Sequence, residues 1–347
     1  MTDPDLKVLP WQVKQWQSLQ QSVQQDRLPH GLLLQGPAGV GKFAFARLFA
    51  QTLLCQQPES VLVPASSTEV LQPCGQCSSC QLIAAGNHPD FQIIEPEKDG
   101  GQIKVDQIRA LIESTSLSSQ YNGYKVIIIN PAEAMNISAA NSLLKTLEEP
   151  PQKTLLILVA RQISRLPATI RSRCQMRQFA LPETKQAIEW LKIQLSDQSD
   201  SQIGSLLEVA EGAPLHAREY AGTPLLEQQQ AVFEDFRGLA QGRLDPVHVA
   251  NEWLKHDHLL PINWLYSWVS DMIRLKQAGD NKIRYAGRSE ALQSLAQDVD
   301  LKRLFALLDQ TTEALQLVNQ LNPLAIIEKL LIYWVNLPRA KTLPATP

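Results

Sequence analysis

The feature that most constrains the fold of this chain is a glycine-rich turn that joins an apolar run to a helix-forming segment. Residues 36–42 read GPAGVGK, which fits the pattern G-x-x-x-x-G-K. His30–Gln35 before the turn predicts a short buried strand, and residues 42–54 after it predict a helix. Glycines allow several backbone N–H groups to point into one concavity, which favours a bound phosphate group. The pattern therefore predicts a phosphate-binding loop in an α/β domain.

Within this loop, the candidate cofactor-binding residues are Gly36, Gly39, Gly41 and Lys42. Lys42 is expected to lie against the β- and γ-phosphates of a nucleotide, where the positive end of the helix dipole adds to its charge. Position 43 departs from the pattern, because Phe43 stands where a Ser or Thr hydroxyl normally binds Mg2+. Phe43 fits a packing role on the helix as well as a lost metal ligand, and both interpretations can hold together.

A second departure follows the β-branched run Val126–Ile129, which predicts a buried parallel strand. Working ATPases with this type of loop carry Asp-Glu after such a strand, to hold Mg2+ and to polarise the attacking water. Here Asn130 and Pro131 follow the strand, and the register of Glu133 predicts a position away from the strand tip. The losses at positions 43, 130 and 131 together predict that the chain cannot hydrolyse ATP. Passive ATP binding in cis is left open.

The rest of the first half alternates between strand and helix patterns, which predicts a doubly wound parallel sheet with helices on both faces. Residues 56–73 have no periodicity and are expected to form a loop. Further strands are expected at 91–95, 125–130 and 154–160, and helices at 11–27, 105–116 and 138–149.

Strand patterns end near Pro182, and the remainder of the chain is predicted to be helical. We expect an α/β domain at 1–182, a small helical domain at 183–222, a larger helical domain at 223–337 and a flexible tail at 338–347. Four tryptophans are expected to supply bulky core to the larger helical domain: Trp253, Trp264, Trp268 and Trp334.

Four of the five cysteines lie close together in the sequence: Cys55, Cys74, Cys77 and Cys80. The odd cysteine count argues against a disulfide framework. Two-residue spacings let neighbouring thiolates bind one ion, and four soft ligands close a tetrahedral site with no open position for water. We therefore predict a structural Zn2+ site in a module at 55–80. An independent DNA-binding finger is the alternative, but residues 81–101 contain Lys98 as their only Lys or Arg.

Charge and hydropathy narrow the possible partners. The net charge is −3, so any nucleic-acid role is predicted to be shared with partner proteins. The longest apolar runs are only strand-length, and the N-terminal residues contain no continuous apolar stretch. The sequence therefore predicts a cytoplasmic protein without membrane association.

Several motifs carry a resemblance to a known family. Asn141–Pro151 reads NSLLKTLEEPP, a helix stopped by two prolines; Ser172-Arg173-Cys174 follows Leu166–Ile170; and residues 28–31 read LPHG before the loop. With the four-cysteine insert, the chain resembles the AAA+ subunits of the bacterial DNA polymerase III clamp loader. The resemblance covers roughly the first 220 residues motif by motif. It implies an AAA+ P-loop domain with a zinc module, a small helical lid domain, and an all-α collar domain for oligomerisation.

The resemblance gives Arg173 a catalytic role, as an arginine finger that projects into the ATP site of the next subunit. A surface arginine in a basic stretch is the alternative, since five arginines lie between positions 161 and 177. Arg161 and Leu215 occupy positions where motor subunits of the family carry sensor residues, which also argues against ATP sensing in cis. Cys174 is interpreted as a small buried residue rather than a reactive one.

As the resemblance implies, the chain would form a hetero-pentameric ring with delta and three gamma/tau subunits. It would belong to a DNA-directed DNA polymerase complex, a nucleotidyltransferase, and act in DNA replication at the nucleoid. It would serve as a rigid scaffold for a neighbouring gamma/tau ATP site and contact the sliding clamp and primed DNA indirectly. Two alternatives stay open: an active gamma/tau-like ATPase motor, and a stand-alone zinc protein that binds nucleic acid.

Overall fold

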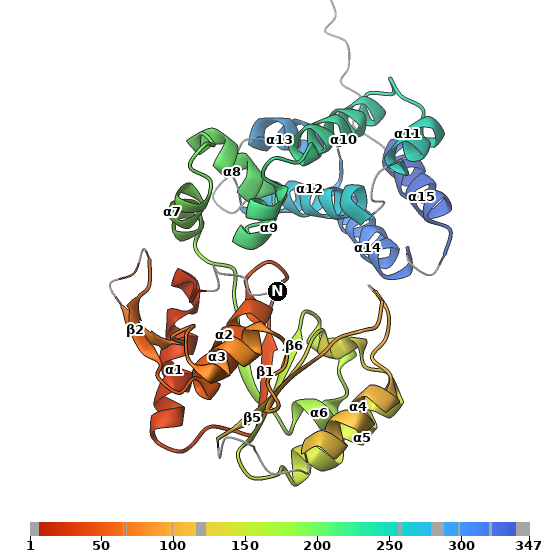
Figure 1. Cartoon of the computed structure of the whole chain (residues 1–347). Coiled ribbons are helices and arrows are strands. Elements are labelled where there is room, and N and C mark those ends of the chain that lie inside the picture. The colour runs from red at the N-terminus through yellow and green to blue at the C-terminus, as the bar shows by residue number, and fades with distance from the viewer. Residues whose placement is uncertain are drawn as a thin grey trace, which may run out of the picture. The chain divides into compact units, whose positions relative to one another are not determined.

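The computed structural model describes residues 7–64, 66, 68–98, 100–115, 123–255, 259–278, 288–297, 299–318 and 321–337. The chain divides into two compact units (Figure 1). The first consists of Met1–Gln194 with Ala213–His216, and the second of Leu195–Gly212 with Ala217–Pro347. The domain boundaries at 182 and 222 stay predictions, and the predicted tail 338–347 lies outside the described residues.

A five-stranded parallel sheet forms the centre of the first unit, in the order β4-β5-β6-β1-β7. Parallel neighbours need crossover connections, and helices supply them between the successive strands (Figure 1). The predicted doubly wound α/β fold is therefore confirmed. The strands of this sheet are β1 (Gly31–Gln35), β4 (Phe91–Ile94), β5 (Lys125–Ile129), β6 (Thr154–Ala160) and β7 (Gln175–Gln178).

The helices of the first unit follow the sequence prediction closely where a periodic apolar face is present. Those predicted at 42–54, 105–116 and 138–149 agree with the structure to within one residue at each end, and the one predicted at 11–27 is divided in two. The helical elements are η1 (Pro10–Gln12), α1 (Val13–Gln24), α2 (Lys42–Leu54), α3 (Ser78–Ala84), α4 (Val105–Thr115), η2 (Ala132–Ala134), α5 (Ile137–Glu148), η3 (Ile163–Arg165), α6 (Ala168–Arg171) and α7 (Thr184–Gln194).

Side chains of β1 alternate between two cores, because successive residues of a strand point to opposite faces. Leu32 and Leu34 pack in one core together with Trp16 of α1 and Phe49 of α2. Leu33 packs in the other core, which includes residues of α4 and α5. Covering both faces fixes the sheet register and places the β1–α2 loop at the carboxyl edge of the sheet.

The expectation of a loop at 56–73 was wrong, because this segment contains an antiparallel hairpin of β2 (Glu59–Leu62) and β3 (Glu69–Gln72). Long-range contacts stabilise it: Trp16 Nε1 and Gln20 Nε2 of α1 donate to the Leu71 carbonyl at 3.1 and 2.9 Å. A pattern read along the segment alone contains no sign of these partners.

The elements described in the second unit are helical, as predicted. The four predicted core tryptophans are all buried; Trp334 stacks on Phe236 with ring centres 4.2 Å apart and donates to the Phe236 carbonyl. None of the described helices is long and apolar enough to span a membrane. The remaining helices are α8 (Asp200–Val209), α9 (Pro214–Tyr220, which begins in the first unit), α10 (Leu225–Ala240), α11 (Pro246–Trp253), α12 (Leu259–Ala278), α13 (Ser289–Gln297), α14 (Leu301–Leu317) and α15 (Pro323–Val335).

Candidate nucleotide and metal sites

The phosphate loop keeps the shape that its glycines allow. Gly36 has a φ of 151° and Gly41 a φ of 86°, and both values favour glycine. A Cβ atom at Gly36 would collide with the carbonyl oxygen of Phe179, just after β7, so the loop lies directly against neighbouring backbone. Gly41 forms the N-cap of α2. The backbone therefore has the predicted strand–loop–helix form.

The side chain of Lys42 lies within this loop, with 5% of its surface exposed. Its Nζ donates to the carbonyl oxygens of Gly36 (2.6 Å) and Pro37 (2.5 Å). Burial lowers the pKa of Lys42 to about 8; the charge of Arg161 acts in the same direction, and the charge of Glu133 opposes it. The amine that was expected to face phosphate thus bonds to its own loop in this structure.

Two residues that precede α1 hold the loop from the other side. Gln12 is 1% exposed and donates from Nε2 to the carbonyls of Val40 (2.9 Å) and Gly41 (3.1 Å). Trp11 Nε1 donates to the same Val40 carbonyl at 3.0 Å. Sequence reasoning missed Gln12, because it is one glutamine among many in a helix-forming segment and only its burial sets it apart.

Leu215, which occupies the predicted sensor position, also contacts the loop. Its backbone N–H donates to the Gly39 carbonyl at 3.1 Å, and its Cδ1 atom lies 3.3 Å from the place where a Cβ of Gly41 would stand. The residue at this position therefore meets the phosphate loop with a backbone amide and an apolar side chain, where an arginine would have brought a charge.

The side chains at positions 43 and 130, which depart from the ATPase pattern, contact other parts of the first unit. Asn130 follows β5 and donates from Nδ2 to Glu95 Oε1 at 2.9 Å. Phe43, in the first turn of α2, packs against the core on that face, and the Arg47 guanidinium lies 5.8 Å from its ring centre. The packing role predicted for Phe43 is confirmed.

Glu133 is predicted to lie away from the tip of β5, and the structure places its carboxylate at the neighbouring strand β6. After Pro131 the chain turns through η2, which carries the Glu133 carboxylate onto the end of β6. There its Oε1 accepts hydrogen bonds from the backbone N–H groups of Arg161 (2.9 Å) and Gln162 (3.3 Å). A carboxylate is therefore present near Lys42, but it caps a neighbouring strand.

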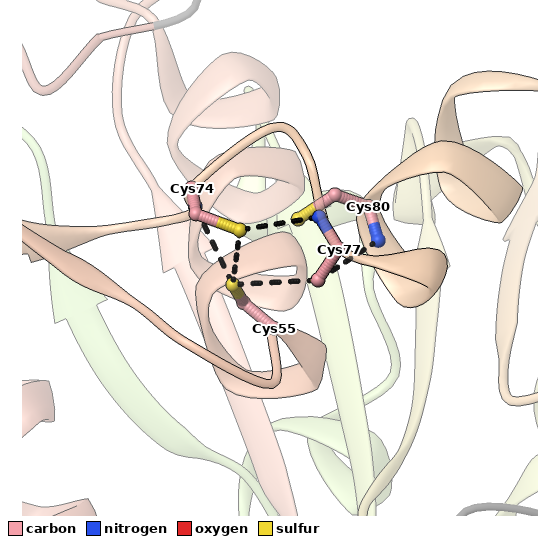
Figure 2. Close-up of side chains that lie close together, drawn as sticks. All are labelled: Cys55, Cys74, Cys77 and Cys80. Atoms are coloured by element: carbon pink, nitrogen blue, oxygen red, sulfur yellow. Dashed lines mark hydrogen bonds between the residues drawn. The ribbon is translucent and has the colours of Figure 1, made fainter.

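The four clustered cysteines converge at the carboxyl end of α2. Cys55 caps that helix, Cys74 follows β3, Cys77 caps the start of α3, and Cys80 lies within α3 (Figure 2). Their sulfur atoms all lie within 4.8 Å of one another, and the Sγ of Cys55 is 3.5 Å from that of Cys74 and 3.8 Å from that of Cys77. Four ligands at 2.3 Å around one tetrahedral Zn2+ would stand about 3.8 Å apart. The cluster could hold a metal ion, and its donor set is consistent with zinc.

Backbone amides around the cluster favour its thiolate forms. The N–H groups of Cys74, Cys77 and Cys80 donate to the sulfur atoms of Cys55, Cys74 and Cys77, at 3.4, 3.4 and 3.5 Å respectively. Burial acts to raise the pKa of Cys77, but the hydrogen bonds from backbone and neighbouring thiols outweigh it and lower this pKa to about 6. Burial raises the pKa of Cys80. One thiolate is therefore prepared for an ion, as expected for a metal site.

Arg173 lies just after α6 and is held by two partners from its own chain. Its Nη2 lies 2.5 Å from Glu148 Oε1, in the NSLLKTLEEPP motif, and its Nη1 donates to the Thr169 carbonyl at 2.9 Å. The side chain of Arg173 is 33% exposed. Cys174 beside it is buried, as predicted, and burial raises its pKa to about 11, which disfavours the reactive thiolate.

Comparisons with known proteins agree across both units. The family model for "DNA polymerase III, delta subunit" matches residues 11–183, and that for "DNA polymerase III, delta subunit, C terminal" matches residues 224–336. The DNA polymerase III subunit delta′ of Pseudomonas aeruginosa is 35% identical over 336 residues, covering 95% of this chain and 98% of the relative. The chain belongs to the DNA polymerase III subunit delta′ family.

Other relatives share the same name over shorter ranges. The Escherichia coli subunit delta′ is 36% identical and covers 59% of this chain and 58% of its own length. The solved structure of a gamma subunit-related protein from Thermotoga maritima is 17% identical, covers 92% of this chain and 98% of its own, and gives a TM-score of 0.45. Membership of the delta′ family confirms the AAA+ type of fold and the helical C-terminal region that the motifs predicted.

The structure brings the predicted site residues of this delta′ family member together in three groups. Gly36, Gly39, Gly41 and Lys42 form one loop, the four cysteines form one cluster, and Arg173 lies apart from both in sequence. Their roles in nucleotide binding, metal binding and catalysis are proposals, which the geometry above supports to different degrees.

Proposed function

We propose that this subunit serves the DNA polymerase III clamp loader as a rigid scaffold that does not hydrolyse ATP, and that it supplies Arg173 to the ATP site of a neighbouring gamma/tau subunit. One observation carries the first half of the proposal. Where a working site needs Mg2+ ligands, this chain has Phe43 packed against the core and Asn130 bound to Glu95. Neither side chain can hold the ion or polarise water in that arrangement.

The remaining charges near the loop support the same conclusion. Lys42 is bound by two loop carbonyls, and the Glu133 carboxylate caps β6 with Oε1. A nucleotide could still lie passively on the loop, because the glycine backbone persists. Passive binding would leave it unhydrolysed, since positions 43, 130 and 131 all lack the groups for phosphoryl transfer.

The surroundings of Arg173 support its role as an arginine finger in trans. An ion pair as exposed as that with Glu148 contributes only about 0–1 kcal/mol, so Arg173 can exchange Glu148 for a phosphate oxygen at little cost. Arginine fingers accelerate hydrolysis by about 10^3–10^5 in related nucleoside triphosphatases. After the exchange, the guanidinium would stabilise the charge that develops on the γ-phosphate during hydrolysis.

The four cysteines would hold a structural Zn2+ in this function. The ion would bind the Sγ atoms of Cys55, Cys74, Cys77 and Cys80 and join the end of α2 to the β2–β3 hairpin and α3. All four positions would be occupied by protein, so the ion would stabilise the fold and take no part in hydrolysis.

The partners proposed are delta and three gamma/tau subunits in a five-membered ring, with indirect contact to the sliding clamp and primed DNA. The helical second unit would lie in the collar.

Reconstituted ATPase assays test both halves. The purified chain with ATP, Mg2+ and primed DNA is expected to show no turnover, and steady turnover would establish the rival function of a gamma/tau-like motor. In the complete complex, Arg173→Ala is expected to remove at least the one site of three that this chain serves, a loss of roughly a third or more of DNA-stimulated turnover. Arg165→Ala, an exposed arginine of the same stretch, is the matched control. Normal turnover with Arg173→Ala would refute the finger.

A further inference from the structure

A buried polar chain connects the cysteine cluster to the central sheet. Ser79 is 1% exposed and His88 is 5% exposed. Ser79 Oγ donates to the Leu54 carbonyl at 2.7 Å and lies 2.9 Å from His88 Nε2. The Asp90 N–H donates to His88 Nδ1 at 3.1 Å. Leu54 is the last residue of α2 and immediately precedes Cys55, whereas Ser79 immediately precedes Cys80.

The donor and the acceptor of each hydrogen bond in this buried series follow from the neighbouring bonds. Because His88 Nδ1 accepts from a backbone amide, a neutral ring must carry its proton on Nε2 and donate it to Ser79 Oγ. The hydroxyl proton of Ser79 then goes to the Leu54 carbonyl. Burial lowers the pKa of His88, against the opposing charge of Asp90, and so favours this neutral ring.

At its other end, this series of hydrogen bonds reaches the central sheet. The Asp90 carbonyl accepts from the N–H of Val126 at 2.9 Å, which fixes the turn before β4 to the first residues of β5. A series of hydrogen bonds therefore runs from the sheet through His88 and Ser79 to the end of α2. The same Ser79 belongs to α3, so one hydroxyl joins both helices that carry cysteines of the cluster.

Packing and a hydrogen bond both act on the segment that precedes Cys55, where Leu54 packs against the core. A cavity of about 210 Å³ is lined by Leu54, Cys55, Ser79 and His88, among others. Beside this cavity, the hydrogen bond from Ser79 Oγ adds a second constraint on the Leu54 carbonyl, and through it on the direction of the Cys55 side chain. Groups of this kind behind a metal ligand commonly change metal affinity by 10–100-fold when they are removed.

We infer that Ser79 and His88 are positioning residues for the four-cysteine metal site. They set the distance between Cys55, at the end of α2, and Cys80 in α3, and thereby the rate at which the site releases its ion. This inference rests on the zinc site proposed above. Neither residue is a ligand, and neither lies in the phosphate loop or beside Arg173.

The test uses the full-length chain loaded with one Zn2+ and measures the rate of metal transfer to a chromogenic chelator. Ser79→Ala is expected to release zinc about 10–100-fold faster than wild type. Ser78→Ala is the matched control: this neighbouring hydroxyl accepts only an exposed hydrogen bond from Gln56, and its loss is expected to change the rate by less than about twofold. Equal release rates for the two variants would overturn the inference.

Two further measurements keep the test decisive. With Co2+ in place of Zn2+, Ser79→Ala is expected to shift the cobalt absorption bands, which report ligand geometry, while Ser78→Ala leaves them unchanged. If Ser79→Ala fails to fold, His88→Gln replaces it, since its amide retains a donor near Nε2 but not the acceptor for Asp90; an unchanged release rate in that variant overturns the inference. A wild-type chain that binds no zinc at all would instead refute the zinc site itself.

Discussion

The two ends of α2 differ in how complete their candidate sites are. At its first residue, the phosphate loop keeps the backbone of a nucleotide site, while the groups that perform chemistry are replaced by Phe43, Asn130 and Pro131. At its last residue, the cysteine cluster keeps a complete set of four ligands. Lys42 and Gln12 donate to carbonyls of the loop, so hydrogen bonds from within the protein hold its shape. The four converging cysteines differ from the loop, because thiolates that lie close together repel one another unless a cation binds them.

The strongest expected effect is therefore on the cluster. Cys74→Ser is expected to abolish stable zinc binding and to unfold the β2–β3 hairpin with α3, since apparent zinc binding energies reach about 10–16 kcal/mol in small structural sites. Metal content and hydrogen exchange over residues 59–84 measure this. Cys174→Ala, outside the cluster, is the control and should keep its zinc. A Cys74→Ser chain with full metal content would remove the contrast between the two ends of α2.

A smaller effect is expected from the loop backbone. Gly36→Ala should lower the free energy of unfolding by about 3–5 kcal/mol, because its methyl group meets the Phe179 carbonyl in addition to the unfavourable φ. Gly86→Ala isolates the second cause, since Gly86 has a φ of 73° with open space around it; about 1 kcal/mol is expected there. Denaturant unfolding of both variants compares them. Equal losses would mean that the loop shape is not held by its contact with Phe179.

The smallest effect concerns the buried charge in the loop. Because the pKa of Lys42 is lowered to about 8 in the fold, the unfolded chain binds more protons between pH 8 and about 10.5. The wild-type free energy of unfolding should therefore rise with pH across this window, relative to that of Lys42→Met, by at most about 3 kcal/mol. Unfolding curves at intervals from pH 7 to 10.5 measure the difference. A difference that falls with pH would show that the loop favours the charged amine.

Predictability from sequence followed the locality of the interactions. β6 and α2 were predicted with exact bounds, because an uninterrupted apolar run and a glycine-lysine helix start are local signals. The β2–β3 hairpin was missed, since its partners lie on α1. The contact of Glu133 with the end of β6 was not foreseen, because its partners lie 28 and 29 residues away. Gln12 was overlooked for the same reason, since its acceptors lie 28 and 29 residues away. The motifs were enough to identify the family. The hydrogen bonds of Lys42 and Gln12 to the phosphate loop could be seen only in the structure.

The contacts of Arg173 have a consequence for conformational entropy. A free arginine side chain loses up to about 2 kcal/mol of rotamer freedom when it is fixed in one geometry. Held by Thr169 and Glu148, Arg173 has lost part of that freedom before any neighbour arrives. When Nη2 exchanges Glu148 for a phosphate oxygen, Nη1 could keep its bond to the Thr169 carbonyl. Part of the cost of ordering the side chain would then fall on the folding of this chain rather than on each catalytic cycle.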